Sequence, residues 1–199
     1  TKASSDDSHG PERKKLRSSE PDLKITVGEK ENTVVHWCHS QVMATHSQYI
    51  DTMFASPMKE SETYEISFPD IEPKVWDAMM QFVSDPVAIL HMKVKDAMLV
   101  VTAYDQYDFA AGLQCCDRVL LKYFQKVYKT HHKKSLDVDL AIDAFLLADE
   151  ANLEKAKKKG IDCFEYLLDS DNYYGRCMLG ESHMERLAPV IARENLLAD

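Results

Sequence analysis

Histidine and cysteine, the residue types that most often perform chemistry, gather in one short segment of this sequence. His36, Cys38, His39 and His46 lie close together, and imidazole nitrogen and thiolate sulfur are ligands that zinc prefers. However, His36 and Cys38 share a predicted strand whereas His39 opens a predicted helix, and structural zinc needs four converging ligands at set spacings. We therefore interpret His39 as a buried or half-buried residue at a helix start, and we predict no metal and no cofactor.

The cysteines are the next candidates for chemistry, and they are odd in number. They are Cys38, Cys115, Cys116, Cys163 and Cys177. Their neighbours are apolar, and a chain of this length can bury its own core, so the sequence predicts reduced thiols in a cytoplasmic or nuclear protein. Cys115 and Cys116 are adjacent, which disfavours a disulfide between them, so a buried free thiol is the prediction there.

Three function classes are excluded by composition. The six glycines are scattered and form no phosphate-binding loop, and no Ser or Cys stands in a nucleophile-elbow context, so we predict no enzyme activity. Lys and Arg number 24 against 33 Asp and Glu, a net charge of −9, which argues against a dedicated nucleic-acid binder. No apolar run approaches the ~20 residues that cross a bilayer, so no membrane segment is expected.

The elements that would position these residues begin after a polar tail. Residues 1–21 are rich in Ser, Pro and charge, and we predict that they are disordered. The run Arg13-Lys14-Lys15-Leu16-Arg17 within them is interpreted either as a nuclear address or as a solvated tail. The sequence does not begin with Met, which leaves open that it is a fragment.

Alternation of apolar and polar residues predicts three strands. Leu23, Ile25 and Val27 mark the first, and the β-branched and aromatic run 33–37 marks the second, which follows as a hairpin. The third strand covers 63–68, with Tyr64, Ile66 and Phe68 on one face. Residues 87–90 are interpreted as a short edge strand.

Helical periodicity predicts the remaining elements. A helical pair lies between strands two and three, with Ser40 and Ser47 as N-caps. Pro73 suits the first turn of the next helix, which Asp85-Pro86 ends. Further helices are expected from Val94 to a break near Gly112, then over 113–127, 137–149, 153–169 and 182–197. Pro189 is expected to bend the last of these.

The order of these elements, read with their residues, resembles the BTB/POZ domain from Asp22 to about Gln125. Residues 22–28 are similar to the opening strand of that family, and 39–50 to its His-x-x-x-Leu-Ala-x-x-Ser-x-Tyr-Phe segment, in which His39, Ser47 and Tyr49 match. Residues 66–71 resemble its third strand and Asp-Ile turn. The resemblance implies an α+β fold, a small three-stranded sheet covered by helical hairpins, followed by an all-α extension.

The second half, through residues such as Asn152-Leu153 and Cys163, resembles the BACK domain, a helical extension of cullin adaptors. We therefore predict a disordered tail at 1–21, a BTB/POZ domain at 22–128 and a BACK-like helical extension at 129–199. Asp22, His39, Ser47 and Tyr49 are interpreted as structural residues of the family motif.

With no chemical site, such a domain acts through its surfaces. In the adaptor branch, a hydrophobic-x-Glu motif between the second helix and the third strand contacts a cullin-3-type scaffold, and Met58-Lys59-Glu60 has that pattern at that place. Met58 would be a flexible apolar anchor and Glu60 a hydrogen-bond acceptor. A surface loop that matches a short motif by chance is the alternative.

Two hypotheses follow from the resemblance. In the first, the chain is an adaptor subunit of a cullin-3-type RING ubiquitin ligase that docks the cullin and forms a homodimer, with the substrate protein unknown. In the second, it is an oligomerisation or scaffold domain without a ligase role. The tail offers no amphipathic helix, so a strand-swapped dimer is not expected, and a dimer through the first helical pair is the alternative.

Overall fold

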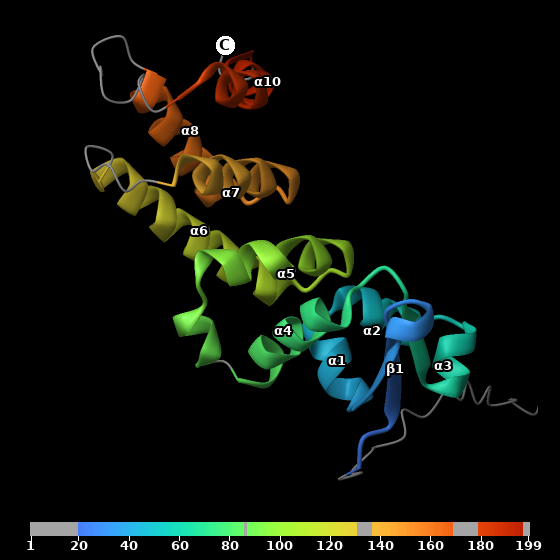
Figure 1. Cartoon of the computed structure of the whole chain (residues 1–199). Coiled ribbons are helices and arrows are strands. Elements are labelled where there is room, and N and C mark those ends of the chain that lie inside the picture. Colours follow the sequence, from blue (N-terminus) through green and yellow to red (C-terminus); the bar gives the residue numbers. More distant parts are fainter. Residues whose placement is uncertain (1–19, 86, 131–136, 169–178, 197–199) are drawn as a thin grey trace, which may run out of the picture.

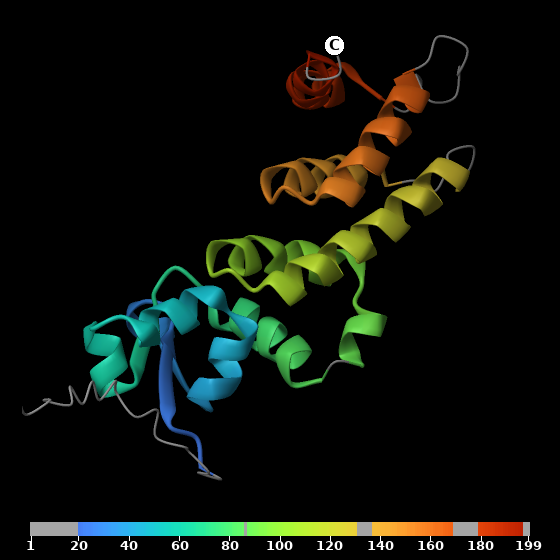
Figure 2. The ribbon, with the colours of Figure 1, turned by 180° about the vertical axis from the view of Figure 1, so that it is seen from behind.

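The computed structural model describes residues 20–85, 87–130, 137–168 and 179–196 (Figure 1). The predicted nuclear address, Cys177 and most of the basic connector 129–135 lie outside the described residues. In both views, a half that contains the sheet lies at one end and a stack of helices at the other (Figures 1 and 2).

A three-stranded sheet of order β2-β1-β3 forms the first half. Its strands are β1 (Leu23–Val27), β2 (Val34–Cys38) and β3 (Glu65–Phe68). β1 pairs antiparallel with β2 and parallel with β3, so that Ile25 is opposite both His36 and Ile66. Three strands are confirmed, although β3 begins at Glu65, two residues later than predicted. In β1 the predicted alternation places Leu23, Ile25 and Val27 in the core with no exposed surface.

Gly28 permits the turn that ends β1. Its φ of +88° is a conformation that residues with a Cβ rarely adopt, and a Cβ built there would lie 2.6 Å from the Asn32 carbonyl oxygen. The Gly28 N–H donates to the Phe68 carbonyl at 3.1 Å, which extends the pairing between β1 and β3.

In the part of the chain that the structure describes, six helices surround the sheet or pack on the helices that cover it. They are α1 (Ser40–His46), α2 (Gln48–Ala55), α3 (Lys59–Thr63), α4 (Pro73–Ser84), α5 (Val94–Gln106) and α6 (Ala110–Thr130). Trp76 of α4 is fully buried and stacks on Phe68 of β3 with ring centroids 5.4 Å apart. The Tyr104 hydroxyl of α5 donates to the Met79 carbonyl at 3.2 Å, which ties α5 to α4.

The all-α extension consists of α7 (Val138–Glu150), α8 (Glu154–Leu168) and α10 (Glu181–Leu196). Its core continues that of α6, because Phe145 of α7 lies 6.4 Å from Phe124 of α6 and 5.3 Å from Phe164 of α8, between ring centroids. Pro189 lies inside α10. The predicted fold class is therefore confirmed, a small three-stranded sheet covered by helical hairpins and followed by helices.

Polar and charged side chains join α10 to α7. Asp139 lies 3.2 Å from His183, and Asp143 pairs with Arg186. Asp149 accepts hydrogen bonds from Arg193 and lies 3.1 Å from Lys157 of α8. Sequence periodicity does not show such links, because each joins residues that are distant in the chain.

Four local predictions are wrong. Residues 88–91 form a 3-10 helix and no edge strand. The helix break falls at Tyr107–Phe109, and Gly112 lies within α6, packed so closely on Tyr104 that a Cβ would lie 2.7 Å from its ring. Tyr64 adopts a left-handed conformation outside β3 and is 38% exposed. The N-cap of α1 is His39, whereas the Ser40 side chain bonds to Asp22; the Ser47 cap is confirmed.

Candidate functional site

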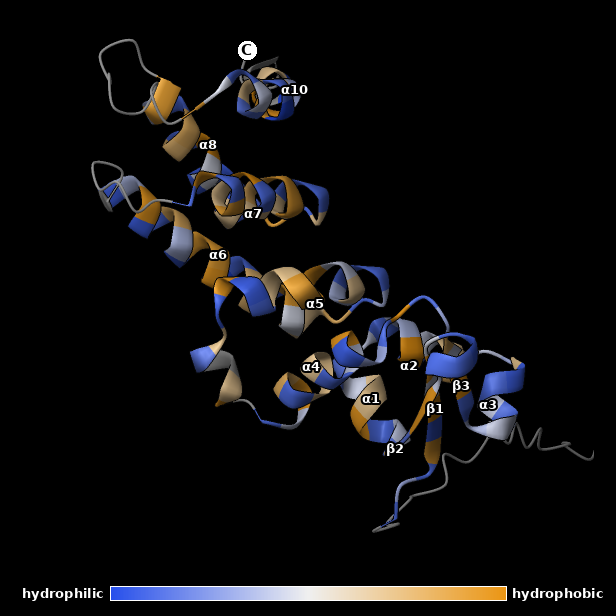
Figure 3. Cartoon of the chain, in the orientation of Figure 1, coloured by the Kyte–Doolittle hydropathy of each residue, from blue (hydrophilic) through white to orange (hydrophobic). Residues whose placement is uncertain are grey.

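The segment that contains Met58 and Glu60 forms a short polar helix, α3, which shows only hydrophilic colours in Figure 3. Met58 is its N-cap residue and 50% exposed, whereas Glu60 is partly buried in its first turn. Ser61 donates twice to the Met58 carbonyl, from its N–H at 3.1 Å and from its hydroxyl at 2.6 Å. The backbone beneath the exposed methionine is therefore held in one conformation, which lowers the entropy cost of binding.

α3 is fixed to the sheet through Tyr64. The ring of Tyr64 stacks on Phe54 of α2 with centroids 5.5 Å apart, and its carbonyl accepts the Lys24 N–H at 2.9 Å. Beside it, Lys24 Nζ lies 3.2 Å from Glu65 across the strands. The left-handed conformation of Tyr64 thus ends α3 and turns the chain into β3.

The start of the sheet is fixed by Asp22. Its carboxylate accepts the Ser40 N–H at 2.8 Å and the Ser40 hydroxyl at 2.7 Å. Burial acts to raise the pKa of Asp22, but these two hydrogen bonds, with the nearby His39, hold the pKa below the usual value. His39 itself is exposed, so the prediction of a buried or half-buried histidine is wrong.

Ser47 joins the α1–α2 hinge to the turn between α5 and α6. The fully buried hydroxyl accepts the Ile50 N–H at 3.1 Å and donates to the Tyr107 carbonyl at 2.7 Å. The Gln48 N–H donates to the Asp108 carbonyl at 3.2 Å. Tyr49, 42% exposed, makes an edge contact with Tyr107 at 5.5 Å between centroids.

The histidines and cysteines that the structure describes do not converge. Among the residues that the structure describes, no group of three His, Cys, Asp or Glu side chains is placed to hold a metal. Nε2 of His36 is buried without a hydrogen-bond partner and lies 3.8 Å from Asp77 Oδ1. In the same part of the chain, no helix is long and apolar enough to cross a membrane.

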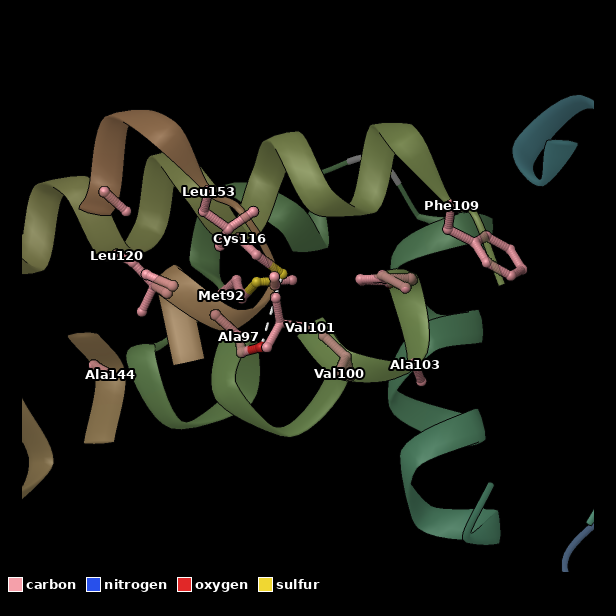
Figure 4. Packing of buried hydrophobic residues seen from close by; sticks show 14 of the residues in the cluster. Met92, Ala97, Val100, Val101, Ala103, Phe109, Cys116, Leu120, Ala144 and Leu153 are labelled. Atoms are coloured by element: carbon pink, nitrogen blue, oxygen red, sulfur yellow. Dashed lines mark hydrogen bonds between the residues drawn. The ribbon is translucent and has the colours of Figure 1, made fainter. Parts of the chain in front are cut away.

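Of the two adjacent cysteines, Cys116 lies in the packing between α5 and α6 (Figure 4). Cys115 and Cys116 are both free, and the fully buried Cys116 thiol lies 3.8 Å from the Ala97 carbonyl oxygen. Burial, with the neighbouring Cys115, raises the pKa of Cys116 to about 12. Cys116 is thus a core residue, and the predicted buried free thiol is confirmed at this position.

Exposed apolar side chains on other elements were not singled out from the sequence. Val42 of α1 is 46% exposed, and on the edge strand β2 Val35 is 48% and Trp37 61% exposed. The strand alternation could have indicated Trp37, because its register partner Lys24 also lies on the outer face of the sheet.

Exposed apolar side chains on β2, α1 and the N-terminus of α3 give this fold surface that another protein could contact. The model of the BTB/POZ domain family matches residues 13–123, more than half of the chain. The chain belongs to the BTB/POZ domain family. BTB/POZ domains are in general interaction modules that mediate protein–protein contacts and oligomerisation, and this chain is accordingly a protein–protein interaction module.

Proposed function

We propose that this BTB/POZ protein is an adaptor that docks a cullin-3-type scaffold through Met58 and Glu60. The observation that carries the proposal is the α3 geometry. A half-exposed methionine stands at the N-terminus of α3, with a glutamate two residues later. Methionine fills irregular grooves, and a carboxylate accepts hydrogen bonds from a partner or interacts with a partner helix N-terminus.

The way α3 is held on the sheet also supports its role as the cullin-docking surface. The Ser61 hydrogen bonds, the stacking of Tyr64 on Phe54 and the contact of Tyr64 with β1 hold α3 on the sheet. A partner therefore meets a surface whose conformation is already set, and less of the contact energy is lost to ordering. In this proposal the helical extension that follows α6 and includes α7 and α8 is BACK-like.

Calorimetry with an isolated cullin-3 N-terminal domain tests the docking. Met58→Ala/Glu60→Ala is expected to weaken binding at least ~10-fold, because truncating a central anchor typically costs about 2 kcal/mol or more. The matched control is Val87→Ala/Glu165→Ala, which removes one exposed apolar residue and one glutamate at positions away from α3. Absence of binding by the unaltered chain overturns the cullin assignment, and equal weakening in both variants overturns the α3 assignment.

We also propose that the chain self-associates through the α1–α2 hairpin. Val42 and Tyr49 present apolar surface from two adjacent helices, and most homo-oligomers are two-fold symmetric dimers. Light scattering is expected to give the dimer mass for the unaltered chain and the monomer mass for Val42→Glu/Tyr49→Glu. If that variant keeps the dimer mass, the contact lies elsewhere.

Self-association with no cullin binding would favour the second function, an assembly or scaffold domain without a ligase role. The exposed Val42 and Tyr49 support this reading as much as the first, because neither involves α3. We propose the cytoplasm or nucleus as the site of action for both, since Cys38, Cys115, Cys116 and Cys163 are free thiols. Imaging of the fluorescently tagged chain in cells tests that location.

A further inference from the structure

A groove of about 470 Å³ lies where the start of α5 meets the middle of α6. Four cationic side chains line it, Lys93 before α5 and Arg118, Lys122 and Lys126 on α6. The three α6 residues recur every fourth position, which places them on one face of the helix, and all four are exposed. The groove therefore presents a row of positive charge beside a helix N-terminus.

Among the described residues that line the groove, the ionisable side chains include basic residues and no carboxylate. Asp96, close by in sequence, accepts the Lys93 N–H at 3.0 Å, and Asp117 accepts the Ala156 N–H of α8 at 2.8 Å. Burial raises the pKa of the Tyr123 hydroxyl, and Asp137 is close enough to Tyr123 to raise that pKa further.

The sequence shows the same segregation of charge. From Arg118 to residue 136 there is no Asp or Glu, although the whole chain has an excess of acidic residues and a net charge of −9. The basic residues of that stretch are Arg118, Lys122, Lys126, Lys129, Lys133 and Lys134. A cationic stretch in an acidic chain favours association with an acidic partner through complementary charge.

Apolar side chains form the rest of the groove. Met92, Val94, Val119 and Tyr123 line it, and all are buried or half-buried. Burial, with Asp137 and Cys163, raises the pKa of Tyr123 to about 12, so its hydroxyl stays neutral. The phosphates of a nucleic acid would contact the cations of the groove only. A polypeptide offers both carboxylates and apolar side chains.

We propose that this groove docks an acidic segment of a partner polypeptide, with the partner's carboxylates on Lys93, Arg118 and Lys122 and its apolar side chains on Val119 and Tyr123. The site is separate from the proposed cullin surface, because in Figures 1 and 2 α3 lies beside the sheet, whereas α6 runs away from the sheet toward the stack of helices. It does not depend on cullin docking.

Fluorescence anisotropy of the full chain with a labelled peptide of repeated Glu-Glu-Leu-Asp units tests the proposal. Arg118→Glu/Lys122→Glu is expected to weaken binding at least ~10-fold, about 1.4 kcal/mol. The matched control is Lys155→Glu/Lys158→Glu, which makes the same change in net charge at exposed positions of α8 and is expected to bind within ~2-fold of the unaltered chain. Binding should also weaken between about 50 and 300 mM salt.

Two further probes separate the partner classes. A peptide with Ser in place of each Leu is expected to bind at least ~5-fold more weakly, because the apolar part of the groove is then unused. Absence of peptide binding, equal weakening in the two charge-reversal variants, or binding of single-stranded oligothymidylate as tight as that of the peptide overturns the proposal. Circular dichroism of each variant checks that it is folded.

Discussion

Replacing Ser47 by Ala tests how the α1–α2 hinge is held. Ser47 is fully buried, caps α2 by accepting the Ile50 N–H and donates to the Tyr107 carbonyl at 2.7 Å. Loss of a serine N-cap costs about 1 kcal/mol, and a buried carbonyl without its donor costs about 1–2 kcal/mol more. We expect Ser47→Ala to lower the free energy of unfolding by about 2–3 kcal/mol, a fall of about 5–10 °C in Tm for a chain of this size.

Urea unfolding followed by tryptophan fluorescence suits this measurement. Both tryptophans, Trp37 and Trp76, lie in the half that contains the sheet, and Trp76 is fully buried, so its emission shifts when that half unfolds. The control is Thr45→Ala on exposed α1 surface, where the hydroxyl donates only to the Gln41 carbonyl one turn earlier. That change is expected to stay within ~0.5 kcal/mol.

The result that refutes this reasoning is a Ser47→Ala chain as stable as the Thr45→Ala chain. The tie between the α1–α2 hinge and the α5–α6 turn would then contribute nothing. Hydrogen exchange adds a local measurement, because the amide of Ile50 is expected to exchange faster in Ser47→Ala than in the unaltered chain.

The remaining predictions concern the extension. Burial acts to raise the pKa of Asp149, but hydrogen bonds from Arg193 and Lys157 hold it below the usual value, so its stabilising contribution is present above pH ~3.8 and lost as the pH falls through the folded-state pKa. Asp149→Asn should therefore lower the free energy of unfolding by about 1 kcal/mol at pH 7, less than for a fully buried pair because Arg193 is half exposed. The two urea midpoints should converge as the pH falls below 3.8 and Asp149 becomes protonated in the folded chain. A difference that stays constant as the pH falls contradicts this. Gly160→Ala places a Cβ 2.5 Å from the buried Phe145 ring, so it should lower Tm although alanine gains about 1 kcal/mol in helix propensity over glycine. The control is Gly180→Ala, where only His183 lies within 4.0 Å, and it should shift Tm little in the same thermal scan.

Sequence periodicity predicts the elements whose pattern is local. Leu23, Ile25 and Val27 alternate and are buried, and Cys116 and Leu120 are buried in the helix predicted over 113–127. Alternation predicts the wrong structure where the apolar–polar pattern extends beyond the strand itself. Tyr64 continues the pattern of β3, but it ends α3 and stacks on Phe54. The helix α3 has no apolar residue and therefore no periodicity to detect.

The candidate site, like the fold, was predicted from the sequence only where its signal is local. The motif indicates where Met58 and Glu60 lie in the chain, but not that Ser61 ties down the Met58 carbonyl. The bond from Ser47 to Tyr107 joins residues sixty positions apart, and a single sequence contains no local signal for such a pair. The basic groove was missed for a similar reason, since Lys93 joins the α6 cations only in the folded chain.

α6 shares its core with α7 and α8, and this limits where the chain can be shortened. The family match ends at residue 123, within α6, whereas Phe124 and Val127 immediately beyond it are buried. A shortened chain cut at the family boundary would lose these two side chains, and α6 would lose the cover that α7 and α8 provide. Cutting the chain there would expose apolar side chains of α6 that α7 and α8 cover, and exposed apolar surface favours aggregation. The BTB/POZ half and the helices after it are therefore best expressed as one chain.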